Sequence, residues 1–282
     1  MIIKFSPAKV NLYLRVLAKR SDGYHDIQTL MQKISLSDEM IFSPIEHGIV
    51  IDCPDSILPE NEDNIVYKAA YALLSHIDRP TGIHITIRKK IPIAAGLGGG
   101  SSNAATTLIT LNEMMRFPFT IDDLMKIGSR IGADVPFFIF GNTAWATGIG
   151  DQLSIAENIP PLWFVLINPS FEISTAMVYE KLNFRLTKEM LEYRSFPPYS
   201  YSLEDIAKGL YNDLEKVAFN LYPELRHLKE LLIEEGAHGA LMSGSGPTVF
   251  GIFTEEDKAA QAEKSLRKLG AGVWAVIKAH SI

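Results

Sequence analysis

A cluster of glycines between a strand pattern and a helix pattern restricts the fold of this chain more than any other feature. Ile83, Ile85 and Ile87 alternate with polar residues, which predicts a strand with one buried face. Segment 92–102 follows with four glycines and two serines, and from Ala104 apolar residues recur at helical spacing. Strand, loop and helix are therefore expected to be consecutive elements of one unit.

This order of elements is typical of a phosphate-binding loop. Glycines reach backbone conformations closed to other residues, so successive N–H groups can converge on oxygens, and the helix start adds donors and the positive end of its dipole. Ser101 and Ser102 can cap the helix or offer hydroxyls to a phosphate or its metal ion. No Lys-Ser/Thr follows the last glycine, and Ser101 stands where G-x-G-x-x-G needs its third glycine. A mobile surface loop is the alternative, which the flanking strand and amphipathic helix disfavour.

Charge and cysteine content exclude several classes of protein. The 282 residues carry 27 Lys and Arg against 33 Asp and Glu, a net charge of -6, so a general attraction to nucleic acid or anionic lipid is not expected. Cys53 is the only cysteine, which excludes an intrachain disulfide and favours a reducing compartment. Without an apolar leader pattern or an apolar run near the ~18 residues that cross a membrane, we expect a cytoplasmic protein.

Two domains are expected, with residues 1–155 forming the first and 156–282 the second. Strand 10–16, helix 61–75 and a helix opened by a capping box at Thr120 and Asp123 are predicted in the first. The second half shows the order β-α-β-β-α-β, the split βαβ arrangement. Between these strands, segment 184–203 contains Pro197 and Pro198 and is predicted to be irregular.

Four motifs, in order along nearly the whole chain, resemble those of the GHMP kinases. They are Ser6-Pro7-Ala8-Lys9-Val10-Asn11 with the continuation Asp22-Gly23-Tyr24-His25, the glycine loop from Pro92 to Asn103, Gly132-Ala133-Asp134-Val135-Pro136, and Ser243-Gly244-Ser245-Gly246-Pro247-Thr248. The three-glycine form of the loop is similar to the branch that phosphorylates a cytidine-diphosphate-linked methylerythritol. The resemblance implies an α+β fold with an N-terminal domain like ribosomal protein S5 and a C-terminal split βαβ (ferredoxin-like) domain.

The same resemblance implies the reaction. ATP, with Mg²⁺ on its phosphates, would phosphorylate the 2-hydroxyl of 4-diphosphocytidyl-2-C-methyl-D-erythritol in the non-mevalonate route to isoprenoid precursors. Lys9 and Asp134 are the expected catalytic pair, with Asp134 as base and Lys9 stabilising charge. From the residues alone, Asp134 would more readily be a hydrogen-bonding residue at a helix end, although a carboxylate beside a buried apolar run needs a partner.

Binding residues are assigned by the resemblance as well. ATP is expected at Asn64, Lys89, Pro92, Gly96, Leu97, Gly98, Gly99, Gly100, Ser101 and Ser102. The acceptor is expected at Asn11, Tyr24, His25, Tyr179, Ser243, Gly244, Ser245 and Gly246, where Tyr24 and Tyr179 stack on the cytosine and His25 bonds to it. The simpler alternatives are a helix cap at Asn64, a solvated lysine at Lys89, packing at Tyr179 and a tight hairpin at Ser243 to Thr248. Asn11 is expected at an outward strand position.

Three other functions stay open. Another GHMP kinase acting on mevalonate, homoserine or a sugar would lack a cytidine requirement, and a non-catalytic nucleotide sensor of the same fold would not turn over ATP. An RNA-binding module is disfavoured by the charge and by the lack of a basic stripe. The six histidines other than His25 show no metal-ligand spacing, so no metal-binding residues are assigned. The small-molecule substrate is the expected partner, and the chain is expected to be a monomer or a weak homodimer.

Overall fold

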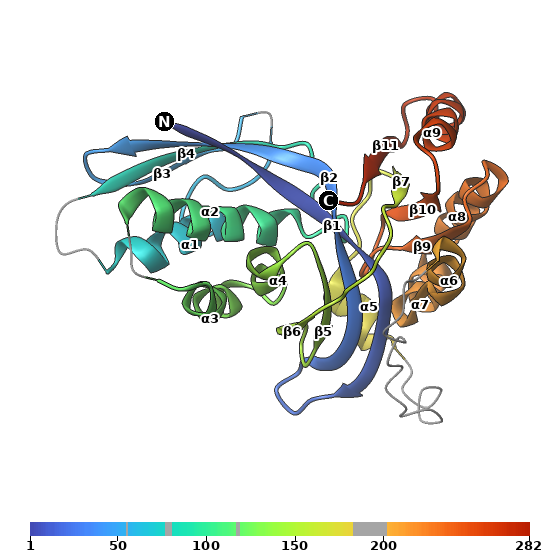
Figure 1. The fold of residues 1–282 in the computed structure, drawn as a ribbon, viewed down its shortest axis with the longest axis horizontal. Coiled ribbons are helices and arrows are strands. Elements are labelled where there is room, and N and C mark those ends of the chain that lie inside the picture. The colour runs from blue at the N-terminus through green and yellow to red at the C-terminus, as the bar shows by residue number, and fades with distance from the viewer. Residues whose placement is uncertain (55, 77–80, 117–118, 183–201) are drawn as a thin grey trace. The chain divides into compact units, whose positions relative to one another are not determined.

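The chain folds as two compact units that alternate along the sequence. The computed structural model describes residues 1–54, 56–76, 81–116, 119–182 and 202–282 (Figure 1). Unit 1 comprises Met1–Ala8, Leu36–Ile93 and Gly98–Asn142, and unit 2 comprises Lys9–Ser35, Ala94–Leu97 and Thr143–Ile282. The glycine loop therefore contributes residues to both units. The α+β class is confirmed, whereas the boundary near residue 155 stays a prediction.

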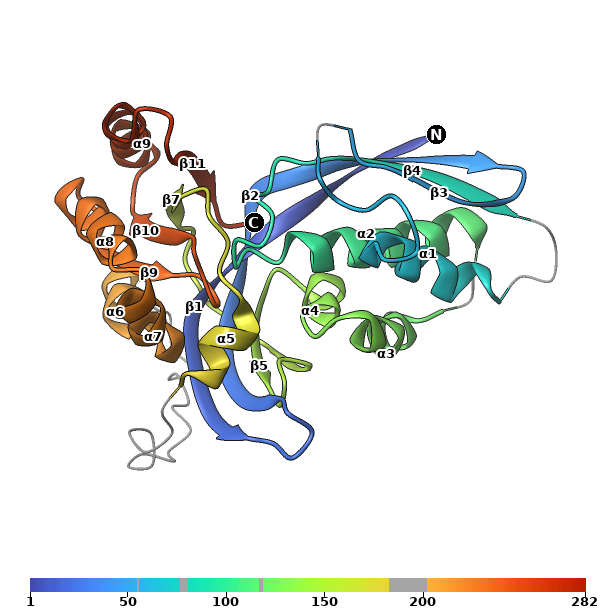
Figure 2. The same ribbon diagram turned by 180° about the vertical axis from the view of Figure 1, so that it is seen from behind.

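Unit 1 is a sheet with helices on one face (Figures 1 and 2). Strand β4 (Gly82–Arg88) pairs in parallel with β3 (Gly48–Asp52) and antiparallel with the second half of β2 (His25–Ile45). The helices among the described residues of this unit are α1 (Ile65–Leu74), α2 (Gly99–Met115), α3 (Ile121–Ile131) and α4 (Val135–Phe140). Strand β1 (Ile2–Lys19) begins in unit 1 and is much longer than the segment 10–16 that the sequence predicts.

The apolar pattern explains this layering. Met40, Phe42 and Ile85 on the strands are fully buried, as is Leu108 on α2, so alternate strand residues and one helix stripe build a common core. The capping box that opens α3 at Thr120 is confirmed, since its side chain and that of Asp123 bond each other's backbone.

Unit 2 contains the split βαβ arrangement predicted for the second half. Its antiparallel sheet has the order β11-β7-β10-β9, formed by Ala275–His280, Trp163–Asn168, Val249–Phe253 and Gly239–Met242. Helices α8 (Glu224–Glu234) and α9 (Glu256–Gly270) lie on one face (Figure 2). The described part of unit 2 also contains β5 (Thr143–Thr147), β6 (Gln152–Ile155), α5 (Thr175–Glu180), α6 (Leu203–Gly209), β8 (Tyr211–Asn212) and α7 (Asp213–Leu221).

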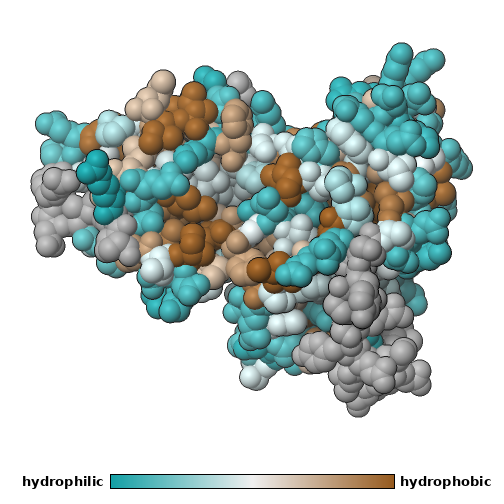
Figure 3. All heavy atoms as spheres, in the orientation of Figure 1, coloured by the Kyte–Doolittle hydropathy of each residue, from teal (hydrophilic) through white to brown (hydrophobic). Residues whose placement is uncertain are grey.

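Unit 2 also uses the N-terminal part of the chain. Strand β8 pairs in parallel with β1 at Tyr13 and Leu14, and β5 pairs antiparallel with the first half of β2. The segment 184–203 that the sequence predicts to be irregular lies, for 184–201, outside the described residues. Apolar side chains appear in groups among the hydrophilic ones on the surface (Figure 3), and no described helix is long and apolar enough to cross a membrane.

Candidate active site

The glycine loop forms the start of α2. Gly98 is the N-cap residue, with a φ of 69° that favours glycine, and Gly99 is the first helical residue. The N–H of Ser102 is bonded within the helix to the carbonyl of Gly98 at 2.9 Å, so the preceding N–H groups belong to the helix start and are available to an anion. The expectation that Ser101 or Ser102 caps the helix is wrong, because no side chain caps it. Ser102 is fully buried, and its Oγ accepts a hydrogen bond from Ser6.

Gly99 is needed for close packing at this helix start. A Cβ on this residue would lie 3.0 Å from Cγ2 of Ile91 and 3.3 Å from the ammonium nitrogen of Lys89. The Lys89 charge therefore lies directly beside the first residue of α2. Its side chain is only 9% exposed, so the alternative of a solvated lysine is wrong.

Lys89 is buried because a carboxylate and an amide hold it. Its Nζ is paired with Asp38 and donates to Oδ1 of Asn103 at 3.2 Å. Asp38 and Asn103 are both buried, and sequence reasoning missed both. Only the position of Asn103 directly after the loop's serines could have indicated it, whereas Asp38 stands in a strand far from the loop in sequence.

Asn64 is the N-cap residue of α1, as the simpler alternative proposed. Its Oδ1 accepts the N–H of Val66 at 2.9 Å, and its Nδ2 donates to the carbonyl of Pro59 at 2.6 Å. Asn64 and Lys89 thus both bond to groups of the protein itself. A contact of either residue with adenine stays a prediction.

In unit 2, Lys9 and Asn11 project from the same side of β1 and form one polar cluster. Lys9 is buried and donates from Nζ to Oδ1 of Asn11 at 2.6 Å. Asn11 in turn donates from Nδ2 to the hydroxyl of Thr29 at 2.8 Å. Asn11 is only 3% exposed, so its expected outward position is wrong: both faces of this strand are covered. The backbone N–H of Lys9 also bonds to the carbonyl of Leu97 in the glycine loop at 2.9 Å.

The loop from Ser243 to Thr248 packs against the same part of unit 2. It joins β9 and β10, which pair Met242 with Val249, so the predicted hairpin turn is confirmed. Ser243 donates from Oγ to the carbonyl of Gly96 at 3.0 Å. A Cβ on Gly96 would lie 2.2 Å from the Ser243 carbonyl oxygen, so only glycine allows the two loops to approach this closely.

Asn212, which sequence reasoning also missed, fixes the course of this second loop. Its Nδ2 donates to the carbonyls of Met242 and Gly244, both at 2.8 Å, while its Oδ1 caps α7 at Leu214. On the other side, the hydroxyls of Thr175 and Ser245 are 2.7 Å apart. The carbonyls and hydroxyls of the loop therefore have set positions.

The aromatic residues predicted to bind the base are partly brought together. His25 and Tyr179 are stacked, with ring centroids 4.9 Å apart and planes at 29°, whereas Tyr24 is exposed. Partial burial lowers the pKa of His25 below its ordinary value of 6.5, and the charge of Lys19 adds to this shift. His25 is consequently neutral at pH 7 and can both accept and donate a hydrogen bond.

Asp134 lies in unit 1, directly before α4. It is the N-cap residue of that helix and its side chain makes no capping hydrogen bond to α4, so the alternative of a helix-end hydrogen-bonding residue stays open. The following residues of α4 from Val135 to Ile139 are buried, as predicted, whereas Asp134 itself is half-buried. The role of Asp134 as a base stays a prediction.

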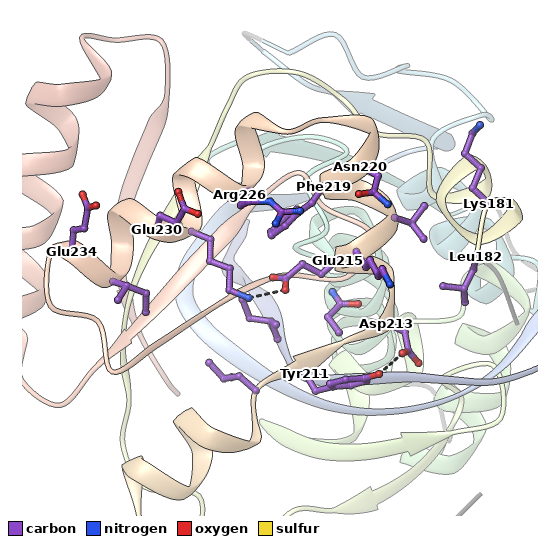
Figure 4. A pocket seen from close by; sticks show the side chains of 17 residues that line it. Lys181, Leu182, Tyr211, Asp213, Glu215, Phe219, Asn220, Arg226, Glu230 and Glu234 are labelled. Carbon is purple, nitrogen blue, oxygen red and sulfur yellow. Dashed lines mark hydrogen bonds and ion pairs between the residues drawn. The ribbon is translucent and has the colours of Figure 1, made fainter. Parts of the chain in front are cut away.

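A separate cavity of about 1020 Å³ lies in unit 2 between α5, α7 and α8 (Figure 4). Glu215 and Lys229 form an ion pair of 2.7 Å within it, and Tyr211 donates to Asp213 at 2.5 Å. Among the described residues that line it, there is none of the predicted site residues. Both acidic and basic side chains line it, so its lining has no single sign of charge.

Comparisons with known proteins agree with the motifs. Residues 64–142 match the model of the GHMP kinases N terminal domain, and residues 200–272 that of the GHMP kinases C terminal. A 4-diphosphocytidyl-2-C-methyl-D-erythritol kinase of Syntrophus aciditrophicus (strain SB) is 58% identical over 282 residues, which is 100% of both chains.

Solved structures extend this result. A crystal structure of 4-(cytidine 5'-diphospho)-2C-methyl-D-erythritol kinase is 33% identical, with a TM-score of 0.83 over 99% of both chains. A homoserine kinase from Cytophaga hutchinsonii, 20% identical, has a TM-score of 0.71 over 100% of this chain and 94% of its own, and shares the fold. The chain therefore belongs to the GHMP kinases, in the family of the 4-diphosphocytidyl-2-C-methyl-D-erythritol kinases.

Proposed function

We propose that this ATP-dependent kinase phosphorylates the 2-hydroxyl of 4-diphosphocytidyl-2-C-methyl-D-erythritol, a step of the non-mevalonate route to isoprenoid precursors. The observation that carries the proposal is the bond between Lys9 and Leu97, which fastens the lysine's strand to the glycine loop one residue before Gly98. Leu97 directly precedes Gly98 in the chain, so the backbone that bonds to Lys9 leads into the segment from Gly98 to Ser101 that would hold the phosphates.

The catalytic roles follow from the chemistry of the transfer. Phosphoryl transfer needs positioning and charge stabilisation more than covalent help. The Lys9 ammonium, oriented by Asn11, would stabilise the charge that develops on the transferring group. Asp134 would accept the hydroxyl proton late in the reaction, because an alcohol is a far weaker acid than a carboxylic acid of pKa ~3.9.

Recognition of the acceptor would depend on the cytidine. A stacked His25 and Tyr179 present a flat aromatic surface, and exposed Tyr24 can cover a base from another side. Neutral His25 can bond to a base that has both donors and acceptors on its edge. Backbone N–H and hydroxyl donors of the loop from Ser243 to Gly246 would hold the diphosphate-linked alcohol.

A metal ion fits the same arrangement. Mg²⁺ is usually held by substrate phosphates, waters and one or two protein oxygens, and the hydroxyl of half-buried Ser101, in the first turn of α2, would be a suitable ligand. When bound, Mg²⁺ shields the negative charge of the phosphates. The expected cytoplasmic location and the expected monomer or weak dimer stay predictions.

A coupled assay of ATP turnover tests the proposal. The enzyme is supplied with ATP and, in parallel, with the cytidine diphospho-sugar alcohol, mevalonate or homoserine. Turnover with the cytidine compound alone is the expected result, and phosphorylation at the 2-position is read from the phosphorus spectrum of the product. Turnover with mevalonate or homoserine instead would favour another GHMP kinase, and no turnover with any acceptor would favour a nucleotide sensor.

A further inference from the structure

We propose that Asp38 is a positioning residue that fastens both ends of the phosphate-binding glycine loop, and thereby sets the affinity for ATP without touching it. The inference rests on the proposed function, in which this loop binds the phosphates of ATP. All side chains that carry it belong to unit 1.

The carboxylate of Asp38 bonds to the segment that enters the loop. Its Oδ1 accepts the backbone N–H groups of Lys90 at 2.8 Å and Ile91 at 2.9 Å. These two residues directly precede Pro92, so their direction decides where the loop begins. A carboxylate oxygen that accepts two successive backbone N–H groups makes two charge-assisted hydrogen bonds and so restrains this turn.

The second oxygen of the same carboxylate bonds to the segment that leaves the loop. Oδ2 accepts from Nδ2 of Asn103 at 3.0 Å, in the second turn of α2. Asn103 also donates to the hydroxyl of Ser6 at 3.0 Å, and Ser6 donates to Ser102 at 2.8 Å. The start of α2 is therefore bonded to β2 through Asp38 and to β1 through Ser6.

Lys89 completes the network and places a positive charge beside the start of the loop's helix, where it could attract the phosphates of a nucleotide. Its ammonium pairs with Oδ2 of Asp38 and lies beside Gly99, where a Cβ would be 3.3 Å away. Asp38 is fully buried and its two oxygens accept four hydrogen bonds, which uses the accepting capacity of a carboxylate. The same carboxylate therefore holds the lysine as well as the loop.

An adjacent pair provides a matched control. Glu39 follows Asp38 on the same strand and bonds to Arg88 at 2.8 Å, but on the other face of the sheet, where the Arg88 side chain is 61% exposed. The substitutions Asp38→Asn and Glu39→Gln therefore remove one carboxylate charge each from neighbouring positions. Only the first faces the loop.

The test measures ATP affinity by titration, and KM for ATP and for the acceptor at the same temperature. In Asp38→Asn the new NH₂ group meets donors whichever way the amide turns: the Asn103 NH₂ and the Lys89 ammonium on one side, or the N–H groups of Lys90 and Ile91 on the other. One end of the loop must therefore move away. We expect the dissociation constant for ATP to rise by about 10- to 100-fold, because misplacement of binding groups by ~1 Å has effects of this size. The acceptor KM and the kcat at saturating ATP should stay within about threefold, and Glu39→Gln should bind ATP normally.

A rescue variant separates positioning from a general loss of stability. In Asp38→Asn with Asn103→Asp, the carboxylate moves to the helix side, where Lys89 already reaches Oδ1 of Asn103 at 3.2 Å, and the new amide on the strand can donate to it. ATP affinity should return to near the unsubstituted value in this double variant. A uniform rise of both KM values in Asp38→Asn, in step with a lower melting temperature, would show a structural role alone and overturn the proposal.

The variant Gly98→Val distinguishes the positioning role of Asp38 from the assignment of the ATP phosphates to the loop. If Gly98→Val loses ATP affinity and Asp38→Asn does not, the loop binds ATP and Asp38 does not position it. If neither variant changes ATP affinity, the assignment of the phosphates to the loop fails instead.

Discussion

The residue that should most change the chemistry is Asp134. Asparagine keeps its size and part of its hydrogen bonding but cannot accept a proton, and general-base contributions are typically ~10²–10⁴-fold in rate. Asp134→Asn should therefore lower kcat by at least about 100-fold while ATP and acceptor still bind. Single-turnover kinetics measure the rate, and melting shifts with each ligand show that the fold and both binding sites persist.

Lys9 should act on the same step. Lys9→Met removes the ammonium that bonds to Asn11, and the double variant with Asp134→Asn should be little slower than the slower single variant, since residues that work as a unit are not additive. A normal kcat in folded, ligand-binding Asp134→Asn would exclude the base role. Additive losses would instead indicate that the two residues serve separate steps.

The lowered pKa of His25 predicts that binding of the acceptor depends on pH. Burial lowers its pKa below 6.5, so the neutral form, which keeps one accepting nitrogen, is favoured in the folded protein above that value. As pH falls below 6.5 towards the lowered pKa, protonation removes the acceptor, and KM for the cytidine substrate should rise. The ATP KM measured in parallel is the reference, and in His25→Gln, which does not titrate, the acceptor KM should lose this dependence.

Single residues also show where sequence reasoning was sufficient and where it was not. The capping box at Thr120 is a local pattern and could be recognised from four neighbouring residues. Asp38 could not, because its partners lie 51 to 65 positions further along the chain and its strand has no motif. The outward position predicted for Asn11 is wrong because alternation describes only one side of a strand, whereas here the other side is covered too.

At the scale of elements, the contact between the glycine loop and the hairpin turn at Ser243 limits which side chains the loop can carry. Gly96 and Gly48 both have a positive φ, at 75° and 79°. A Cβ at Gly48 meets nothing within 4 Å, whereas at Gly96 it would lie 2.2 Å from the Ser243 carbonyl. Both alanine variants share the backbone strain of about 1–2 kcal/mol, and Gly96→Ala adds overpacking of about 1–3 kcal/mol.

Gly96→Ala should consequently melt at a clearly lower temperature than Gly48→Ala and should raise the acceptor KM, because the turn at Ser243 has to move. Thermal melting and steady-state kinetics on the two variants measure this difference. Equal melting temperatures and an unchanged acceptor KM would show that the two loops tolerate separation. The loop and the turn were each predicted from their glycines, but their contact was not, since 147 residues separate Ser243 from Gly96 in sequence.

At the scale of the whole molecule, segments that are far apart in the sequence share one hydrophobic core. The split βαβ pattern could be predicted because each of its strands and helices has its own periodicity. Its core, however, contains Leu14, Val16 and Ile27 from the N-terminal part of the chain beside residues of β7, α7 and α8. Local periodicity predicts which residues are buried but not which distant segment buries them.

A fragment of residues 156–282 should therefore not fold stably, although it contains every strand of the split βαβ sheet. It lacks Leu14, Val16 and Ile27, whose burial is worth about 1.5–3 kcal/mol each, and these losses approach the 5–15 kcal/mol by which a whole domain is stable. It also lacks the backbone of Val16 that Asp213 accepts from at 2.7 Å, and the strand that pairs with β8. Circular dichroism and urea titration should show no cooperative transition for this fragment, and mixing it with residues 1–155 should restore one. A fragment that unfolds cooperatively on its own, at the denaturant concentration of the intact chain, would show that the N-terminal strands are dispensable to the core of unit 2.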